Sequence, residues 1–65
     1  MNPDRVFEKV AGVRPYHVDI DMDTRIIAFE VLDKSGRKRT VSGPIGTDMD
    51  KAVEALAADY LKASK

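Results

Sequence analysis

Apolar residues fill nearly all of residues 26–32 (Ile-Ile-Ala-Phe-Glu-Val-Leu), whereas the segments on either side alternate apolar with polar residues. A β-strand that is buried on one face alternates in this way, because successive side chains point to opposite faces. A strand that is apolar on both faces therefore predicts a second covering surface. A chain of 65 residues has little left to supply one. We interpret the second face of this strand as a surface for a partner.

The first residues have the signals of a short helix. Asn2 suits the N-cap, Pro3 suits the first helical position and Gly12 can end a helix. Residues 3–11 are therefore predicted to be helical, and their apolar side chains at positions 6, 7 and 10 would lie on one side.

Three segments are predicted to form strands. Residues 16–22 alternate, residues 25–32 contain the apolar strand described above, and residues 37–42 form a short third strand. Asp23 and Thr24 (23–24) are predicted to make a tight turn between the first two strands. Residues 33–36 are predicted to be a four-residue hairpin connection, because their glycine permits a positive φ.

A loop and a longer helix are predicted to complete the chain. Residues 43–46 contain two glycines and a proline, which continue neither a helix nor a strand. Thr47 is the predicted N-cap, and Asp48 and Asp50 favour the positive end of the helix dipole. The helix is expected to run to about Lys62, and its apolar face carries Met49, Val53, Leu56 and Tyr60.

The predicted fold is a single small α+β domain over residues 1–65: a helix, a three-stranded antiparallel meander and a C-terminal helix, with both helices on one sheet face. The side chains expected beneath the helices are Val18, Ile20, Met22, Ile27, Phe29, Val31 and Val41, with Tyr16 pointing the same way. The other face would show His17, Asp19, Asp21, Ile26, Ala28, Glu30, Leu32, Lys38, Thr40 and Ser42. A bulge near Ala28 or Glu30 would exchange the two faces of the second strand.

Composition narrows the function classes. The 11 basic residues equal the 11 acidic ones, so the net positive charge that drives non-specific nucleic-acid binding is missing. The chain has no cysteine, which fits a reducing compartment and excludes a disulfide framework. The first residues lack a signal-peptide pattern, and no apolar run approaches the ~20 residues that span a bilayer. We expect a soluble, cytoplasmic protein that does not bind membranes.

The function that this pattern favours is protein binding. The predicted contact surface centres on an apolar stripe with charged residues of both signs at its rim, which is the common anatomy of interfaces. Its residues are Ile26, Ala28 and Leu32, with Asp19, Asp21, Lys38 and Arg39 around them. Burial of the apolar side chains would contribute about 4 to 6 kcal/mol before the costs of association. The partner is another protein or a second copy, and the chain would act as a regulatory accessory protein.

A nucleic-acid-binding function is the first alternative. Arg37, Lys38 and Arg39 are consecutive, with Lys34 nearby and Arg25 at the start of the neighbouring strand. Such a basic cluster can contact phosphate groups. The acidic residues of the first strand would repel a nucleic-acid backbone that lay across the same sheet.

The order helix, three strands, helix is similar to the double-stranded-RNA-binding fold, which small mRNA-interferase toxins also use. The resemblance spans the whole chain and implies RNA binding. The RNA-binding family carries Lys-Lys-x-Ala-Lys at the start of its last helix, where residues 48–52 read Asp-Met-Asp-Lys-Ala. The toxins carry a histidine near the start of the second strand, where this chain has Arg25 and Ile26. The likeness is therefore one of topology, and a fold alone does not assign an activity.

Calcium binding is the second alternative. Asp19, Asp21, Asp23 and Glu30 have the spacing of ligands in an EF-hand loop. Thr24 occupies the place of the loop glycine, and the flanking segments have strand patterns. The other interpretation is a strand with acidic outward positions, which protects an exposed edge from aggregation.

Enzyme activity is not expected. His17 is the only histidine and cysteine is absent, so a nucleophile, its base and an orienting group cannot readily be assembled. Asp19 and Asp21 would lie about 7 Å apart on one strand face in solvent, with no neighbour that raises the pKa of either carboxyl. We expect no catalytic residue, no resident metal and no cofactor.

Overall fold

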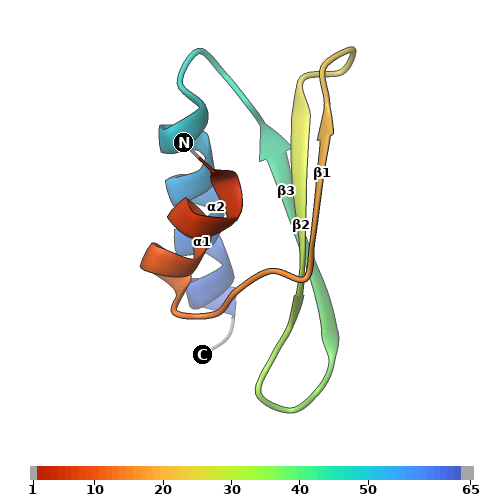
Figure 1. Ribbon diagram of the computed structural model, residues 1–65, viewed down its shortest axis with the longest axis vertical. Helices are drawn as coiled ribbons and strands as arrows, with labels where there is room; N and C mark the ends of the chain where they lie inside the picture. The colour runs from red at the N-terminus through yellow and green to blue at the C-terminus, as the bar shows by residue number, and fades with distance from the viewer. Residues whose placement is uncertain (1, 64–65) are drawn as a thin grey trace.

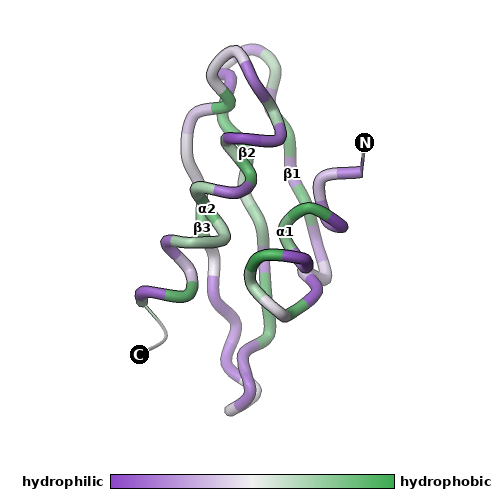
Figure 2. Tube along the Cα trace, turned by 90° about the vertical axis from the view of Figure 1, so that its left-hand side faces the viewer, coloured by the Kyte–Doolittle hydropathy of each residue, from purple (hydrophilic) through white to green (hydrophobic). Residues whose placement is uncertain are grey.

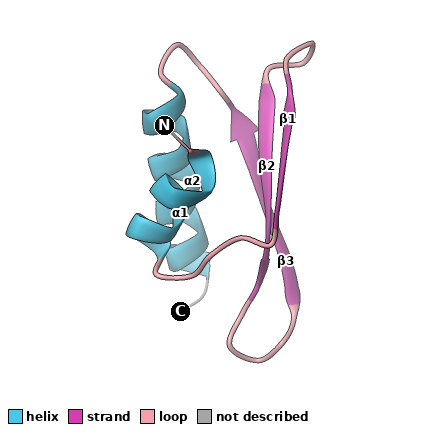
Figure 3. Cartoon of the chain, viewed as in Figure 1, coloured by secondary structure: helices cyan, strands magenta, loops and turns pink. Residues whose placement is uncertain are grey.

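The computed structural model describes residues 2–63, and it has the predicted order of elements. The elements are α1 (Pro3–Ala11), β1 (His17–Asp21), β2 (Ile26–Leu32), β3 (Lys38–Pro44) and α2 (Met49–Ala63). The strands form one antiparallel sheet in the order β1-β2-β3. Both helices lie on the same side of this sheet, and no segment within residues 2–63 covers the other side (Figure 1, Figure 3). The α+β architecture expected from the sequence is confirmed.

The ends of α1 follow the predicted signals. Pro3 is the first helical residue, and the carbonyl of Asn2 accepts hydrogen bonds from the N–H groups of Arg5 and Val6. The side chain of Asn2 makes no capping hydrogen bond. Gly12 closes the helix with φ 78°, and its N–H donates to the Glu8 carbonyl at 2.8 Å. This left-handed conformation is one that glycine adopts without steric cost.

The core lies between the helices and β2. Its buried residues are Val6, Phe7, Ala11, Ile27, Phe29, Val31, Ile45, Val53, Leu56, Ala57 and Tyr60. Phe7 of α1 stacks on Phe29 of β2 with ring centroids 4.5 Å apart, and its ring lies 5.9 Å from that of Tyr60 of α2. Figure 2 shows the contrast between this hydrophobic interior and the hydrophilic hairpin at the far end of the sheet. The inward face predicted for the second strand is confirmed.

Coverage of β1 is less complete than predicted. Val18 is only partly buried, and Ile20 and Met22 are 39% and 60% exposed. The prediction that the helices cover Ile20 and Met22 is wrong, because β1 is an edge strand and the core gathers over β2. Met22 lies beyond the end of β1 in the turn. Val41 of β3 is also only partly buried.

A β-bulge at the start of β1 changes the direction of one aromatic side chain. His17 is the register partner of Glu30, yet the N–H of Tyr16 also donates to the Glu30 carbonyl, at 2.9 Å. Two residues therefore oppose one, and the Tyr16 hydroxyl reaches the Glu30 carboxylate at 3.4 Å. Tyr16 thus lies beside Glu30, away from the helices, and its predicted inward direction is wrong. Within β2 burial alternates without interruption, so the bulge considered there is not present.

The connection between β1 and β2 is longer than the predicted two-residue turn. Residues 22–25 form it, and the last of them, Arg25, has φ 56°. The Asp21 carboxylate accepts hydrogen bonds from the N–H groups of Asp23, at 2.9 Å, and Thr24, at 3.3 Å. Asp21 therefore stabilises the turn through its side chain.

The third strand continues further than predicted. Gly43 and Pro44, expected in a loop, are the last residues of β3 and pair with Ile27 and Ile26. The next ladder hydrogen bond runs from the Ile45 N–H to the Arg25 carbonyl. In an antiparallel ladder this places position 44 where an N–H would point away from β2, so proline is tolerated on this edge strand.

Asp48 caps the start of α2, so the prediction that Thr47 is the N-cap is wrong. The Asp48 carboxylate accepts a hydrogen bond from the Lys51 N–H at 3.2 Å, and its carbonyl accepts one from the Ala52 N–H. An aspartate at this position satisfies a helix donor and also favours the positive end of the dipole.

Candidate functional site

The candidate site is the sheet face turned away from the helices, which we call the open face. The strand register arranges its residues in rows across the sheet. The rows are Asp21, Ile26 and Pro44; Asp19, Ala28 and Ser42; His17, Glu30 and Thr40; and Leu32 with Lys38. Tyr16 joins this face through the bulge. The face therefore holds acidic residues on β1, mostly apolar residues on β2, and polar or basic residues on β3.

Apolar side chains on the open face are not covered by any segment of the part of the chain that the structure describes. Ile26 is 44% exposed, Leu32 is 50% exposed and Tyr16 is 48% exposed. Burial of the remaining surface of each aliphatic side chain would contribute about 1 kcal/mol. Glu30 separates Ile26 and Ala28 from Leu32, so the predicted apolar stripe consists of two parts.

Glu30 forms the polar centre of the open face. Its carboxylate accepts the Tyr16 hydroxyl at 3.4 Å and lies 3.9 Å from Nε2 of His17. Partial desolvation, followed by the negative charge and hydrogen bond of Glu30, raises the pKa of the Tyr16 hydroxyl. Tyr16 therefore stays protonated at neutral pH and donates to the carboxylate.

Most of the predicted contact residues share this face. Asp19, Asp21, Ile26, Ala28, Leu32 and Lys38 are brought together. Arg39 is not, because it pairs with the buried Val31 and its guanidinium lies over the ring of Tyr60, 5.6 Å from the centroid. Strand alternation alone predicts the position of Arg39, because its neighbours Lys38 and Thr40 face the open side and Arg39 must then face the helices. Tyr16 and Pro44 also belong to the open face, although neither is among the predicted contact residues. The bulge that turns Tyr16 outward has no sequence signal, and the proline and glycines of residues 43–46 are typical of a loop.

The predicted basic cluster is dispersed. Lys34 and Arg37 lie at the β2–β3 hairpin, whereas Arg25 lies at the other end of β2, about 25 Å away along the strand. The Arg25 guanidinium donates to the Gly46 carbonyl at 2.8 Å and ties the first turn to the loop before α2. Arg39 points to the helix side. The basic residues therefore do not form one surface for a phosphate backbone.

The calcium interpretation also loses its structural basis. Residues 19–30 form parts of two paired strands and a turn, where an EF-hand has a loop between two helices. The Asp21 carboxylate accepts hydrogen bonds from the turn. Within residues 2–63, no group of three or more histidine, cysteine, aspartate or glutamate side chains is placed to hold a metal ion.

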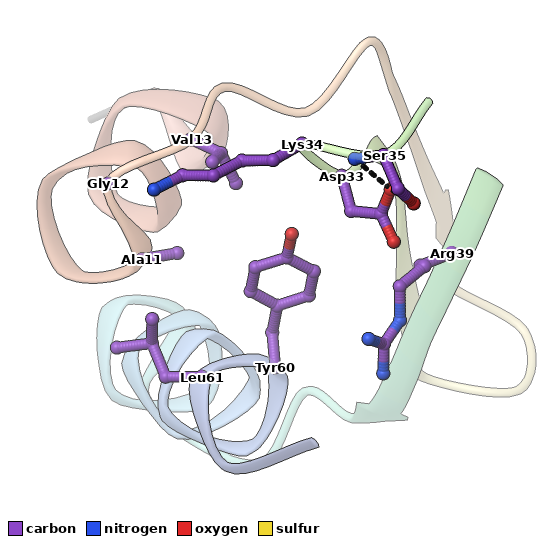
Figure 4. A pocket seen from close by; sticks show the side chains of 9 residues that line it. All are labelled: Ala11, Gly12, Val13, Asp33, Lys34, Ser35, Arg39, Tyr60 and Leu61. Carbon is purple, nitrogen blue, oxygen red and sulfur yellow. Dashed lines mark hydrogen bonds between the residues drawn. The ribbon is translucent and has the colours of Figure 1, made fainter. Parts of the chain in front are cut away.

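A shallow cavity of about 510 Å³ lies on the helix side of the sheet, between the end of α1, the β2–β3 hairpin and α2 (Figure 4). Its lining consists of Ala11, Gly12, Val13, Asp33, Lys34, Ser35, Arg39, Tyr60 and Leu61. The cationic side chains of Lys34 and Arg39 share it with the carboxylate of Asp33. These charges favour neither an anionic nor a cationic ligand.

Asp33 organises the hairpin beside this cavity. One of its carboxylate oxygens accepts hydrogen bonds from the Ser35 hydroxyl at 2.6 Å, the Ser35 N–H at 3.0 Å and the Arg37 N–H at 2.9 Å. The bond from the Ser35 hydroxyl, followed by the one from the Arg37 N–H, holds the pKa of the Asp33 carboxyl below its usual range. The ionised side chain thus fixes the turn.

Acidification is expected to loosen this hairpin. Because folding lowers the pKa of Asp33, its contribution to stability is present above the pKa of the unfolded chain and is lost as the pH falls through the lower pKa of the folded state. The amide chemical shifts of Ser35 and Arg37 should follow this titration in NMR spectra. The variant Asp33→Asn should show no such transition. A transition within the usual aspartate range or above it would contradict the expectation.

No protein-family model, curated protein or solved structure matches this chain. Over residues 2–63, none of the helices has the length and apolar character that crossing a bilayer requires. The function is therefore inferred from the arrangement of the open face.

Proposed function

We propose that this chain is a small non-enzymatic accessory protein that binds another protein through the open face. The observation that carries the proposal is the half-exposed state of Ile26, Leu32 and Tyr16 on the sheet face opposite α1 and α2 (Figure 1). An apolar centre with charged residues of both signs around it is typical of protein contacts, in which tyrosine is enriched. Here Asp19 and Lys38 supply charge at opposite edges.

The size of the open face favours a foreign partner over a second copy. Three strands about 4.8 Å apart and a central strand of 7 residues span roughly 350 Å². A stable interface buries about 800 Å² on each partner. Two copies joined through this face alone would fall below that value, whereas a different protein can also contact the strand edges. The dispersed basic residues likewise support a protein partner over a nucleic acid.

The proposal is tested with a photo-crosslinking residue placed at Leu32 in the full chain and irradiated in lysate of the native host. Leu61 provides a matched position, because it is also a partly exposed leucine but lies on α2. We expect a discrete crosslinked product from position 32 and none from position 61. The substitution Ile26→Thr should remove that product, because it deletes apolar surface while keeping a residue suited to a strand.

Each alternative has its own result. Equal products from positions 32 and 61, or none from position 32, would contradict binding through the open face. A product with twice the mass of the chain would replace the foreign partner by a second copy, and light scattering at high micromolar concentration checks this directly. Capture of a nucleic acid that is lost as salt rises would favour the first alternative instead.

A further inference from the structure

The outer edge of β1 carries main-chain hydrogen-bonding groups that no strand within residues 2–63 pairs with. The bond from the Ile45 N–H to the Arg25 carbonyl sets the alternation of the ladder, so odd-numbered residues of β2 bond to β3 and even-numbered ones bond to β1. The β1 residues of the open face are the register partners of the even-numbered ones. The N–H and C=O groups of Val18 and Ile20 therefore point away from the sheet. An extended segment beside β1 can pair with them.

The side chains of β1 are apolar on the helix side of the sheet and mostly acidic on the open face. On the helix side Ile20 is exposed, Met22 follows it in the turn, and Val18 is partly buried. On the open face, Asp19 and Asp21 are exposed, and Glu30 lies one strand further in. Lys38 is the only lysine or arginine among the described residues on this face, so carboxylates dominate its β1 side. A neighbouring strand would therefore be complementary if it were apolar toward the helices and basic toward the open face.

We propose that β1 accepts, as a fourth strand, an extended segment of the partner protein in which apolar and basic residues alternate. This inference rests on the proposed protein-binding function and names the chemistry of the segment that is bound. Main-chain hydrogen bonds at Val18 and Ile20 supply attachment, and the alternating side chains supply selectivity. In an antiparallel arrangement the residues opposite Asp19 and Asp21 form the closely spaced pairs, which suits lysine or arginine.

The other edge and a second copy both fit less well. The edge of β3 ends at Pro44, which lacks an N–H, and carries Lys38, which opposes an approaching basic segment. Two β1 strands joined by a two-fold axis would place their rows of Asp19 and Asp21 side by side. Pairing of β1 with β3 of another copy would leave free edges at both ends and would not close.

The probe for this inference is a synthetic nine-residue peptide of alternating valine and lysine, titrated into the full chain and followed by amide chemical shifts. We expect shifts at Val18 and Ile20 and none at Thr40 or Ser42 on the other edge. A valine–glutamate peptide of the same length should not bind. A valine–lysine peptide with its lysines grouped together should bind more weakly, because its side chains cannot match both faces.

Proline substitutions distinguish binding at the edge of β1 from binding at the edge of β3. Ile20→Pro removes an outward N–H without removing a bond to β2, so the fold is expected to tolerate it while peptide affinity falls about tenfold. Thr40→Pro is the matched variant on β3, where the N–H also points outward, and it should leave affinity unchanged. Asp19→Lys sets one positive charge beside the negative charge of Asp21, so affinity for the valine–lysine peptide should fall and its preference over the valine–glutamate peptide should disappear. This third variant keeps the test decisive if Ile20→Pro fails to fold.

Failure of this inference is distinguishable from failure of the proposed function. Absence of shifts at millimolar valine–lysine peptide, or shifts confined to Thr40 and Ser42, overturns strand addition at β1. Shifts confined to Ala28 and Leu32 also overturn it, while they agree with binding through the open face. The crosslinking test at Leu32 uses no peptide and therefore stands or fails on its own.

Discussion

Replacement of Phe29 by alanine is expected to unfold this domain. The ring of Phe29 is fully buried and stacks on Phe7, which in turn contacts Tyr60, so the three rings together join β2 to both helices. Truncation of a buried phenylalanine costs about 3 to 5 kcal/mol. A core of this size supplies a net stability of about 3 to 5 kcal/mol at most. The loss therefore equals the whole stability of the folded chain.

Circular dichroism as a function of urea concentration measures this effect. The unmodified chain should show a cooperative transition, and Phe29→Ala should show a largely unfolded spectrum without urea. Leu32→Ala is the control, because Leu32 lies on the same strand but faces the open side and should cost about 1 kcal/mol or less. Similar midpoints for the two variants would contradict the assigned faces of β2.

Replacement of Gly43 by valine is expected to destabilise the contact between β3 and α2. A Cβ atom at position 43 would lie 3.0 Å from Cδ2 of Leu56, closer than ordinary van der Waals contact. Valine adds two further methyl groups against this buried side chain, and overpacking of this kind costs about 1 to 3 kcal/mol. The backbone of Gly43 has no positive φ, so the feature that favours glycine at this position is the close approach of the Leu56 side chain.

Ser42→Val is the matched control for this substitution. Ser42 is the neighbouring residue on β3 and points to the open face, where valine meets no helix. Thermal unfolding should show a clear loss for Gly43→Val and a change within about 0.5 kcal/mol for Ser42→Val. Partial recovery in the double variant Gly43→Val with Leu56→Ala would identify Leu56 as the residue that is crowded. Equal effects of both valines would refute the close approach.

The sequence was sufficient to predict the fold because local signals agreed with the packing. Pro3 and Gly12 mark the two ends of α1, and the alternation of β2 places Ile27, Phe29 and Val31 toward the helices. The length of β3 was underestimated, because Pro44 is acceptable only on a strand whose outer edge is free. That condition concerns neighbouring strands and is not visible along the chain.

Most residues of the open face could also be predicted, because strand alternation agrees with the packing. Ile26, Ala28 and Leu32 follow from the period of two in β2. Arg39 was misplaced because it was grouped with its charged neighbours rather than by alternation, and the structure places it over Tyr60. The outward direction of Tyr16 could not be predicted, since it depends on a bulge formed against Glu30.

The exposure of apolar side chains along β1 was the other feature that could not be predicted from the sequence. Ile20 alternates correctly and still lies open, because burial requires a helix above the strand and the core gathers over β2. The period of a strand indicates which face a residue occupies, whereas its coverage depends on how far the helices extend. The exposed edge of β1 therefore emerged only from the assembled fold.

The contrasting surroundings of the two tyrosines make this tryptophan-free chain its own optical reporter. Tyr60 is enclosed by the core and is shielded from dissolved quenchers, whereas Tyr16 lies in solvent on the open face. Near-ultraviolet ellipticity of Tyr60 follows the integrity of the interior, and iodide accessibility of Tyr16 follows occupancy of the sheet surface. Folding and complex formation can thus be monitored separately in one unlabelled sample.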